Sequence, residues 1–249
     1  MAHQPDTVLI TGAAQRVGAC LARTFHKAGY NVIIHYFQSQ DSAIKLSEEF
    51  NDIRKQSAFL CQGDLSDTAS IKAQVLSITD NLSVLINNAS SFYPTPIEEF
   101  TEEHWDDLFT SNAKAPLFLT QALLPLLTTS QRTKTGCVIN LVDIHAQRPL
   151  KDHTIYCMAK AANQMMTMSL AKELAPNVRV NGIAPGAILW PSQSNEISEE
   201  YKKDTLDKIP ANKLGNATDI AETALFLATG PEYITGQIIS VDGGRTLYS

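Results

Sequence analysis

Short apolar runs alternate with helix-forming stretches along almost the whole chain, and this alternation limits the fold more than any other feature. The first run, 7–10, is followed by the glycine turn Thr11-Gly12 and by a helical stretch, 17–28, that Gly29 closes. A second apolar run, 31–36, completes a strand–helix–strand unit. Because neighbouring parallel strands need a long crossover connection, usually a helix, this order predicts a parallel sheet.

The same plan continues to the C-terminus. We expect further strands at 58–61, 84–86, 137–141, 178–183 and 237–241, and helices at 41–55, 68–79, from 101, 115–127, 153–174 and 217–228. Pro116 and Pro125 are expected to kink or divide the apolar stretch 115–127. The polar, turn-rich stretch 190–210 is predicted to form a substrate lid.

No linker, repeat or low-complexity segment divides the 249 residues. We therefore predict a single domain, 1–249, of the α/β class. Its core would be a doubly wound parallel sheet (Rossmann fold) of about seven strands with helices on both faces.

Composition excludes several kinds of partner. The formal net charge is −6 and basic residues are not clustered, which argues against nucleic acid. No unbroken apolar run is long enough to span a membrane. The four cysteines are widely separated and show no CxxC spacing, which is typical of reduced thiols in a cytoplasmic protein. The six histidines lack ligand spacing, so we predict no metal site.

The turn Thr11–Gly18 lies where a doubly wound fold binds the pyrophosphate of a dinucleotide. It follows a strand and opens onto a helix N-terminus, where backbone N–H groups and the helix dipole favour an anion. An ordinary turn between a strand and a helix is the alternative, because glycines serve both. The middle glycine expected in such a turn is replaced by Arg16, which would place a cation beside the phosphates.

The end of the second strand distinguishes NAD from NADP. An NAD site would have an acidic residue there, but 35–39 reads His-Tyr-Phe-Gln-Ser and the first acid is Asp41. With Arg16, His35 and Ser39 available to a 2′-phosphate, we expect NADP or NADPH. Asp64, directly after the third strand, is suited to the adenine amino group; a helix N-cap is the alternative.

Tyr156 and Lys160 are one helical turn apart and share a face. A free tyrosine has a pKa of about 10, and an ammonium beside it in a dry site would lower that pKa toward neutrality. The pair therefore predicts a proton donor, whereas an interfacial tyrosine beside a solvated lysine is the alternative. Asp143 precedes Tyr156 by thirteen residues and could belong to the same site or cap the turn at 144–148.

Taken together, these residues resemble the short-chain dehydrogenase/reductase family over essentially the whole chain. The motifs are Thr11-Gly12…Gly18, Asn87-Asn88-Ala89, Asn112, Tyr156…Lys160, Asn181…Pro185-Gly186, Ile234-Thr235-Gly236-Gln237 and Val241-Asp242-Gly243-Gly244. Within the family the chain is most similar to pteridine reductases. The residues that carry this closer likeness are Arg16, His35, Tyr36, Ser39, the segment Asn87–Pro96, and Asp143 where most relatives have serine. The chain departs from the pattern at Gln38, where some pteridine reductases have arginine, and after Trp190.

This resemblance implies an NADPH-dependent reduction of a pterin by hydride transfer to its pyrazine ring. Tyr156 would protonate the adjacent nitrogen, Asp143 would hold or recharge Tyr156, and Lys160 would bind the nicotinamide ribose and lower the tyrosine pKa. Asn112 would shape the nearby helix and hold a relay water, with helix-interior filler as the alternative. The resemblance also implies cofactor contacts from Gly12, Val17, Gly18, Tyr36, Leu65, Asn87, Ala89, Pro185 and Gly186.

The substrate contacts follow from the same resemblance. Phe92 would stack on the pterin, although a loop residue folded onto the core is the alternative. Arg16 would reach the polar edge of the pterin as well as the pyrophosphate, and Trp190 would line the substrate side. The family likeness further implies a homotetramer that uses the long helices beginning near Thr101 and His153. Burial of their apolar stretches against the chain's own sheet would explain those stretches equally well.

Two other functions remain open. The first is a reductase of ketones or 3-oxoacyl thioesters, because most of the motifs are shared across the family. Asp143 argues against it, since a carboxylate would repel a developing alkoxide whereas a ring nitrogen must gain a proton. The second is a dinucleotide sensor or scaffold without turnover. The complete set of Asn112, Tyr156 and Lys160 argues against that reading, because a sensor needs only the cofactor pocket. Dihydrofolate is a second candidate substrate of the pterin reductase.

Overall fold

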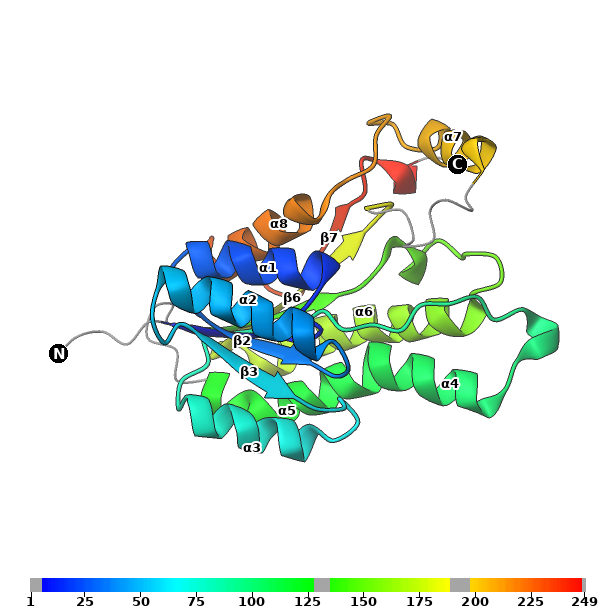
Figure 1. Ribbon diagram of the computed structural model, residues 1–249. Helices are drawn as coiled ribbons and strands as arrows, with labels where there is room; N and C mark the ends of the chain where they lie inside the picture. Colours follow the sequence, from blue (N-terminus) through cyan, green and yellow to red (C-terminus); the bar gives the residue numbers. More distant parts are fainter. Residues whose placement is uncertain (1–5, 128–134, 189–197, 248–249) are drawn as a thin grey trace.

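The computed structural model describes residues 6–127, 135–188 and 198–247. Within these residues lies a seven-stranded sheet of order β3-β2-β1-β4-β5-β6-β7, in which every neighbouring pair is parallel (Figure 1). The strands are β1 Thr7–Ile10, β2 Asn31–Tyr36, β3 Ala58–Gln62, β4 Val84–Asn87, β5 Gly136–Leu141, β6 Val178–Pro185 and β7 Ile238–Val241. The predicted doubly wound parallel sheet is confirmed.

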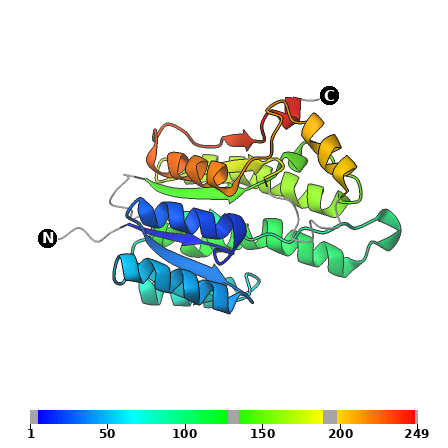
Figure 2. The same ribbon diagram turned by 45° about the horizontal axis from the view of Figure 1, so that its top comes forward.

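Helices cover both faces of the sheet. They are α1 Arg16–Lys27, α2 Gln40–Ile53, α3 Thr68–Ile78, α4 Glu102–Phe109, α5 Ala115–Leu127, α6 Thr154–Leu174, α7 Glu199–Asp207 and α8 Ala217–Thr229. Figure 2 shows α8, α1 and α2 side by side on one face. The buried residues of α3, α5 and α6 pack on the other.

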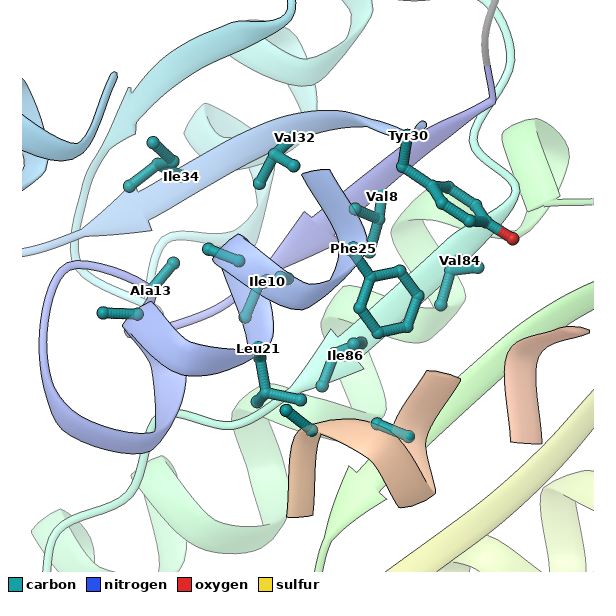
Figure 3. Packing of buried hydrophobic residues seen from close by; sticks show 14 of the residues in the cluster. Val8, Ile10, Ala13, Leu21, Phe25, Tyr30, Val32, Ile34, Val84 and Ile86 are labelled. Atoms are coloured by element: carbon teal, nitrogen blue, oxygen red, sulfur yellow. The ribbon is translucent and has the colours of Figure 1, made fainter. Parts of the chain in front are cut away.

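Alternate residues of each strand point to opposite faces, so each strand contributes to two cores. Val8 and Ile10 of β1 lie under Leu21 and Phe25 of α1 (Figure 3). Leu9, between them in the sequence, belongs to the cluster formed with α3 and α5. Burial on both faces explains why these strands read as nearly continuous apolar runs.

The strand order reverses at β1, which pairs with β2 on one side and β4 on the other. In doubly wound sheets the crevice outside the carboxyl ends of the strands at such a reversal binds the ligand. The arrowheads of the strands and α4 lie at the same end of the molecule (Figure 1). The residues discussed below gather at this end.

Three elements differ from the expected ones. Pro116 and Pro125 do not divide α5, which is continuous from Ala115 to Leu127 and has Pro125 inside it. Pro116 is the second residue of α5, and the carbonyl of Asn112, four residues before it, accepts from Asn163 Nδ2 at 2.7 Å, so the N–H that proline lacks does not leave this carbonyl unpaired. A π-helical turn, Thr110–Lys114, joins α4 to α5.

Part of the predicted turn-rich lid is helical. Within 190–210 the structure places α7. The ion pair Lys202–Glu199 lies within this helix, and Lys208, directly after it, pairs with Asp204, at 2.6 Å each. Trp190 and the rest of 189–197 lie outside the described residues. The roles of Trp190 and of a lid therefore stay predictions.

No described helix combines the length and apolar character needed to cross a bilayer. In the same part of the chain, no three histidine, cysteine, aspartate or glutamate side chains gather as metal ligands would. Cys20, Cys61, Cys137 and Cys157 are free thiols.

Candidate active site

In the glycine turn after β1, the backbone segments at Gly12 and Gly18 lie very close to each other. Gly12 has a φ of +61°, in the left-handed region that glycine adopts without strain. A Cβ on Gly18 would lie 2.1 Å from the carbonyl oxygen of Gly12, so only glycine fits there. The side chain of Asn88 donates to the carbonyls of Thr11 (2.8 Å) and Gly12 (3.2 Å). The turn is therefore held by the residue that follows β4 and leads directly into the N-terminus of α1, an end of a helix that favours an anion.

Arg16 is the first residue of α1 and is exposed at the turn. Its φ is +50°, also in the left-handed region. A residue with a Cβ is strained in that conformation. This backbone explains why a glycine is expected at the position.

His35 faces inward rather than toward the cofactor side. It is 2% exposed, and its Nδ1 accepts a hydrogen bond from the backbone N–H of Gly12 (3.3 Å) while Nε2 lies 3.1 Å from the carbonyl oxygen of Gly63. Burial lowers its pKa to about 4, so the ring is neutral at pH 7. In contrast to the sequence-based expectation, His35 supports the turn and offers no charge to a 2′-phosphate. Tyr36 is buried as well, whereas Ser39, just before α2, is partly exposed.

Asp64 is exposed after β3, and its Oδ1 accepts from the backbone N–H of Ser66 at 2.8 Å. Hydrogen bonds from Ser66 lower its pKa. The N-cap of α3 is Asp67, which accepts from Ser70, so the capping alternative considered for Asp64 belongs to Asp67. Leu65, beside it, is partly buried.

The other expected cofactor residues lie at neighbouring strand ends. Asn87 ends β4, but its side chain is buried and donates to Asn140 Oδ1 at 2.8 Å, so any cofactor contact would come from its backbone. The backbone N–H of Ala89 donates to the hydroxyl of Thr11. At the end of β6, a Cβ on Gly186 would lie 2.7 Å from Asp242 Cα, so Gly186, next to Pro185, permits close packing.

Tyr156 and Asp143 are in direct contact. Asp143 follows β5, Tyr156 lies in the first turn of α6, and the phenol donates to Asp143 Oδ2 at 2.9 Å. Asp143 Oδ1 accepts from the backbone N–H of His145 at 2.8 Å. The aspartate therefore caps the following turn with one oxygen and holds the tyrosine with the other.

The pKa of Tyr156 is raised well above 10, first by burial and then by the charge of Asp143. This result differs from the expectation that Lys160 lowers it. Lys160 Nζ lies 5.6 Å from the centre of the tyrosine ring and donates to the carbonyl of Leu141 at 2.8 Å. Its own pKa is lowered to about 8 by burial, against the charge of Asp143. Tyr156 is therefore a protonated donor in this state.

Asn112 lies in the π-helical turn and is buried. Its Nδ2 donates to the carbonyls of Ser91 and Leu108, both at 2.9 Å. Two polar residues that sequence reasoning missed complete its surroundings. Ser90 donates to Asn112 Oδ1 at 2.7 Å and also hydrogen-bonds Tyr156, and Asn163 Nδ2 donates to the Asn112 carbonyl at 2.7 Å. Asn163 follows Lys160 by three residues, a helical spacing that could have revealed it.

Phe92 lies at the mouth of the site. Its ring is 54% exposed and meets the Tyr156 ring edge-on, with centroids 4.8 Å apart. The imidazole of His153, which the sequence analysis did not include in the site, stacks on Phe92 at 4.8 Å and 19°. Phe92 is therefore not folded into the core, and an aromatic cluster borders Tyr156.

Comparisons with known proteins find related sequences over almost the whole chain. The model of a family described as enoyl-(acyl carrier protein) reductase matches residues 12–246. Pteridine reductase 1 of Leishmania tarentolae is 34% identical over an alignment of 280 positions, which covers 96% of this chain and 96% of the relative. The uncharacterized oxidoreductase YmfI of Bacillus subtilis is 32% identical over 240 residues, 96% of this chain and 98% of the relative. The 3-oxoacyl-[acyl-carrier-protein] reductase FabG of Staphylococcus aureus is 33% identical over 243 residues, 96% of this chain and 97% of the relative.

Proposed function

The chain belongs to the short-chain dehydrogenase/reductase family of oxidoreductases, and we propose that it is an NADPH-dependent pteridine reductase. Its substrates would be oxidised or dihydro pterins, with dihydrofolate as a further candidate. The relative from Leishmania tarentolae, named pteridine reductase 1, supports the proposal over nearly the whole chain.

The hydrogen bond between Tyr156 and Asp143 is the observation that carries this proposal. In reducing a carbonyl, an enzyme must stabilise negative charge on oxygen, and a carboxylate touching the proton donor would oppose that charge. In reducing a pyrazine ring, the atom beside the reduced carbon is a nitrogen that gains a proton and develops no such alkoxide. The pair at 2.9 Å suits the second reaction.

NADPH is the cofactor proposed for the glycine turn, and when bound it would supply the hydride. The backbone of Gly12 and Gly18 would admit its pyrophosphate, and Arg16 and Ser39 would meet the 2′-phosphate. Asp64 would accept from the adenine amino group. Lys160 uses one of its three N–H donors on Leu141, and another would bind a ribose hydroxyl of the cofactor.

Proton delivery would come from the chain's own residues. Because its pKa is raised, Tyr156 keeps its proton at neutral pH. The same shift makes the phenol a weaker acid, so it would donate only to a ring nitrogen that hydride transfer makes strongly basic. The resulting phenolate would be unfavourable beside Asp143, so rapid reprotonation is needed. Asp143 is only partly buried and would connect the tyrosine to solvent for that step.

Phe92 would hold the flat pterin ring. Its half-exposed face at the mouth of the site offers stacking area beside the tyrosine. Arg16 would contact the polar edge of the same ring. The phenylalanine would thus select planar substrates over flexible chains.

A reductase of 3-oxoacyl thioesters is the second candidate. The FabG relative is 33% identical to this chain over 243 residues, nearly the same identity as that of the pteridine reductase. It shares the cofactor turn, Tyr156 and Lys160 with the first. The two candidates differ in what Asp143 and Phe92 must do. Variants of Asp143 and Phe92 therefore distinguish the two candidate functions.

We propose a homotetramer in keeping with the family likeness. Exposed apolar side chains lie on α5 and α6, namely Leu117, Phe118, Met165 and Met168. Such side chains on two neighbouring helices favour a contact between subunits. Light scattering of the purified protein tests the assembly directly.

NADPH oxidation tests the function, with biopterin, dihydrobiopterin, dihydrofolate and a short 3-oxoacyl thioester offered side by side. The proposal expects turnover of the pterins and little with the thioester. Turnover of the thioester alone would reject it. Tight NADPH binding without reduction of any substrate would instead favour a sensor.

The variant Asp143→Ser distinguishes the two candidate functions. If the substrate is a pterin, this variant should lose most of its turnover because the tyrosine is no longer recharged. If the substrate is a carbonyl, a serine should preserve or improve turnover.

A further inference from the structure

The two residues that flank Phe92 are both held by one carboxylate. Ser91 Oγ donates to Asp107 Oδ1 at 3.3 Å, and Tyr93 Oη donates to Asp107 Oδ2 at 2.9 Å. Asp107 lies in the last turn of α4, which packs on α6 and so on the helix that carries Tyr156. Each oxygen of one side chain therefore fixes one side of the loop.

The backbone of the loop is tied to the same helix end. The backbone N–H of Ser91 donates to Ser111 Oγ at 3.2 Å, and that hydroxyl donates to the carbonyl of Asp107 at 2.9 Å. The carbonyl of Ser91 accepts from Asn112 at 2.9 Å. Asp107 thus holds the side chains while Ser111 and Asn112 hold the backbone.

The hydroxyl of Tyr93 remains a hydrogen-bond donor to Asp107. Its pKa is raised to about 12, first by burial and then by Asp107, so its hydroxyl stays protonated across the working pH range. Its ring packs against the cluster of Leu108, Ile155 and Tyr156. The hydrogen bond therefore links the loop to the catalytic helix as well as to α4.

Phe92 itself has little to fix its direction. It is half-exposed, and its described ring contacts are with His153 and Tyr156. An exposed aromatic ring that must meet a flat substrate depends on its backbone for orientation, because side-chain packing supplies few contacts. Its flanking residues are where that orientation would be set.

We propose that Asp107 is a positioning residue for substrate recognition, which holds Ser91 and Tyr93 so that Phe92 presents its ring to the pterin beside Tyr156. The proposal rests on the proposed function for the identity of the substrate. Asp107 touches neither substrate nor cofactor in this role. It acts through the loop alone.

The test compares Asp107→Ala with Asp106→Ala, an exposed carboxylate at the preceding position of the same helix. Hydrogen exchange of the peptide covering 90–95 reports on the loop without any substrate. Steady-state kinetics with dihydrobiopterin and titration with NADPH report on recognition. Because Asp107 is exposed, its replacement should leave the protein folded.

Asp107→Ala should speed exchange in 90–95 and raise the pterin KM about tenfold, since small misplacements of positioning groups can cost up to about a hundredfold. Its kcat and NADPH affinity should stay within about twofold, because Tyr156 and the glycine turn are untouched. Tyr93→Phe should reproduce part of the effect, and the double variant Asp107→Ala/Tyr93→Phe should be no worse than Asp107→Ala alone. Asp106→Ala should behave as wild type.

Unchanged hydrogen exchange in 90–95 of Asp107→Ala would show that Asp107 does not hold the loop and would overturn the proposal. Faster exchange with an unchanged pterin KM would overturn its role in recognition, as would an equal loss of NADPH affinity. A wild-type protein that reduces only the 3-oxoacyl thioester would reject the proposed function and with it the pterin role of Asp107. The exchange result would then still show whether Asp107 orders the loop, so the two failures are distinguishable.

Discussion

Replacing Arg16 by alanine and by glycine separates the conformation of its backbone from the charge of its side chain. Arg16 has a φ of +50° at the start of α1. A residue with a Cβ in the left-handed region is less stable by about 1–2 kcal/mol, whereas glycine adopts it freely. Both variants remove the guanidinium and all of its contacts. They therefore differ only in the Cβ.

The expected order is the reverse of the usual one in a helix. At an ordinary helical position glycine is less stable than alanine by about 1 kcal/mol. Here glycine avoids the left-handed strain of a residue with a Cβ, about 1–2 kcal/mol. This gain exceeds the stability that glycine loses through the greater conformational entropy of the unfolded chain, about 0.4–1 kcal/mol. Arg16→Gly should therefore be more stable than Arg16→Ala by roughly 0.5–1 kcal/mol, or a few degrees at most in Tm for a chain of this size.

Urea and thermal unfolding without cofactor measure that difference, and titrations with NADPH and NADH measure the charge. Both variants should lose NADPH affinity by the same factor and NADH affinity by less. If Arg16→Gly were less stable than Arg16→Ala, the left-handed backbone conformation of Arg16 would be refuted. Equal losses for NADPH and NADH would refute the contact with the 2′-phosphate.

Three further predictions concern Tyr156, Asp143 and Lys160. Tyr156→Phe should abolish turnover in the NADPH oxidation assay while NADPH still binds; retained turnover would exclude the tyrosine as donor. Asp143→Asn should lower the pKa of Tyr156, because the carboxylate helps to raise it, and tyrosinate absorbance read against Tyr156→Phe would show no change if that cause is wrong. The pKa of Lys160 is lowered from 10.5 to about 8, so the folded protein binds fewer protons than the unfolded chain between these values and the free energy of unfolding should gain a contribution as pH rises. Urea unfolding across that window should show a smaller rise in Lys160→Met, and an identical slope would contradict the lowered pKa.

The features that local sequence determines were predictable. The alternation of apolar runs and helical stretches gave the sheet and most helix bounds, since it depends on residues close together in the chain. The helix expected from 101 is α4, and Thr101 accepts from the backbone N–H of His104 as its N-cap. The prolines of α5 misled the prediction, because Asn163 pairs the carbonyl four residues before Pro116 and the helix continues through Pro125.

The sequence by itself determined which residues are available to the site: the glycine turn, Arg16, Asp143, Tyr156 and Lys160. Only the tertiary structure decided what each of them faces. It turned His35 inward and raised rather than lowered the pKa of Tyr156. It also brought Asp107 of α4 to both flanks of Phe92. Burial and hydrogen-bond partners depend on which distant segments pack together, and neither helical nor strand periodicity carries that information.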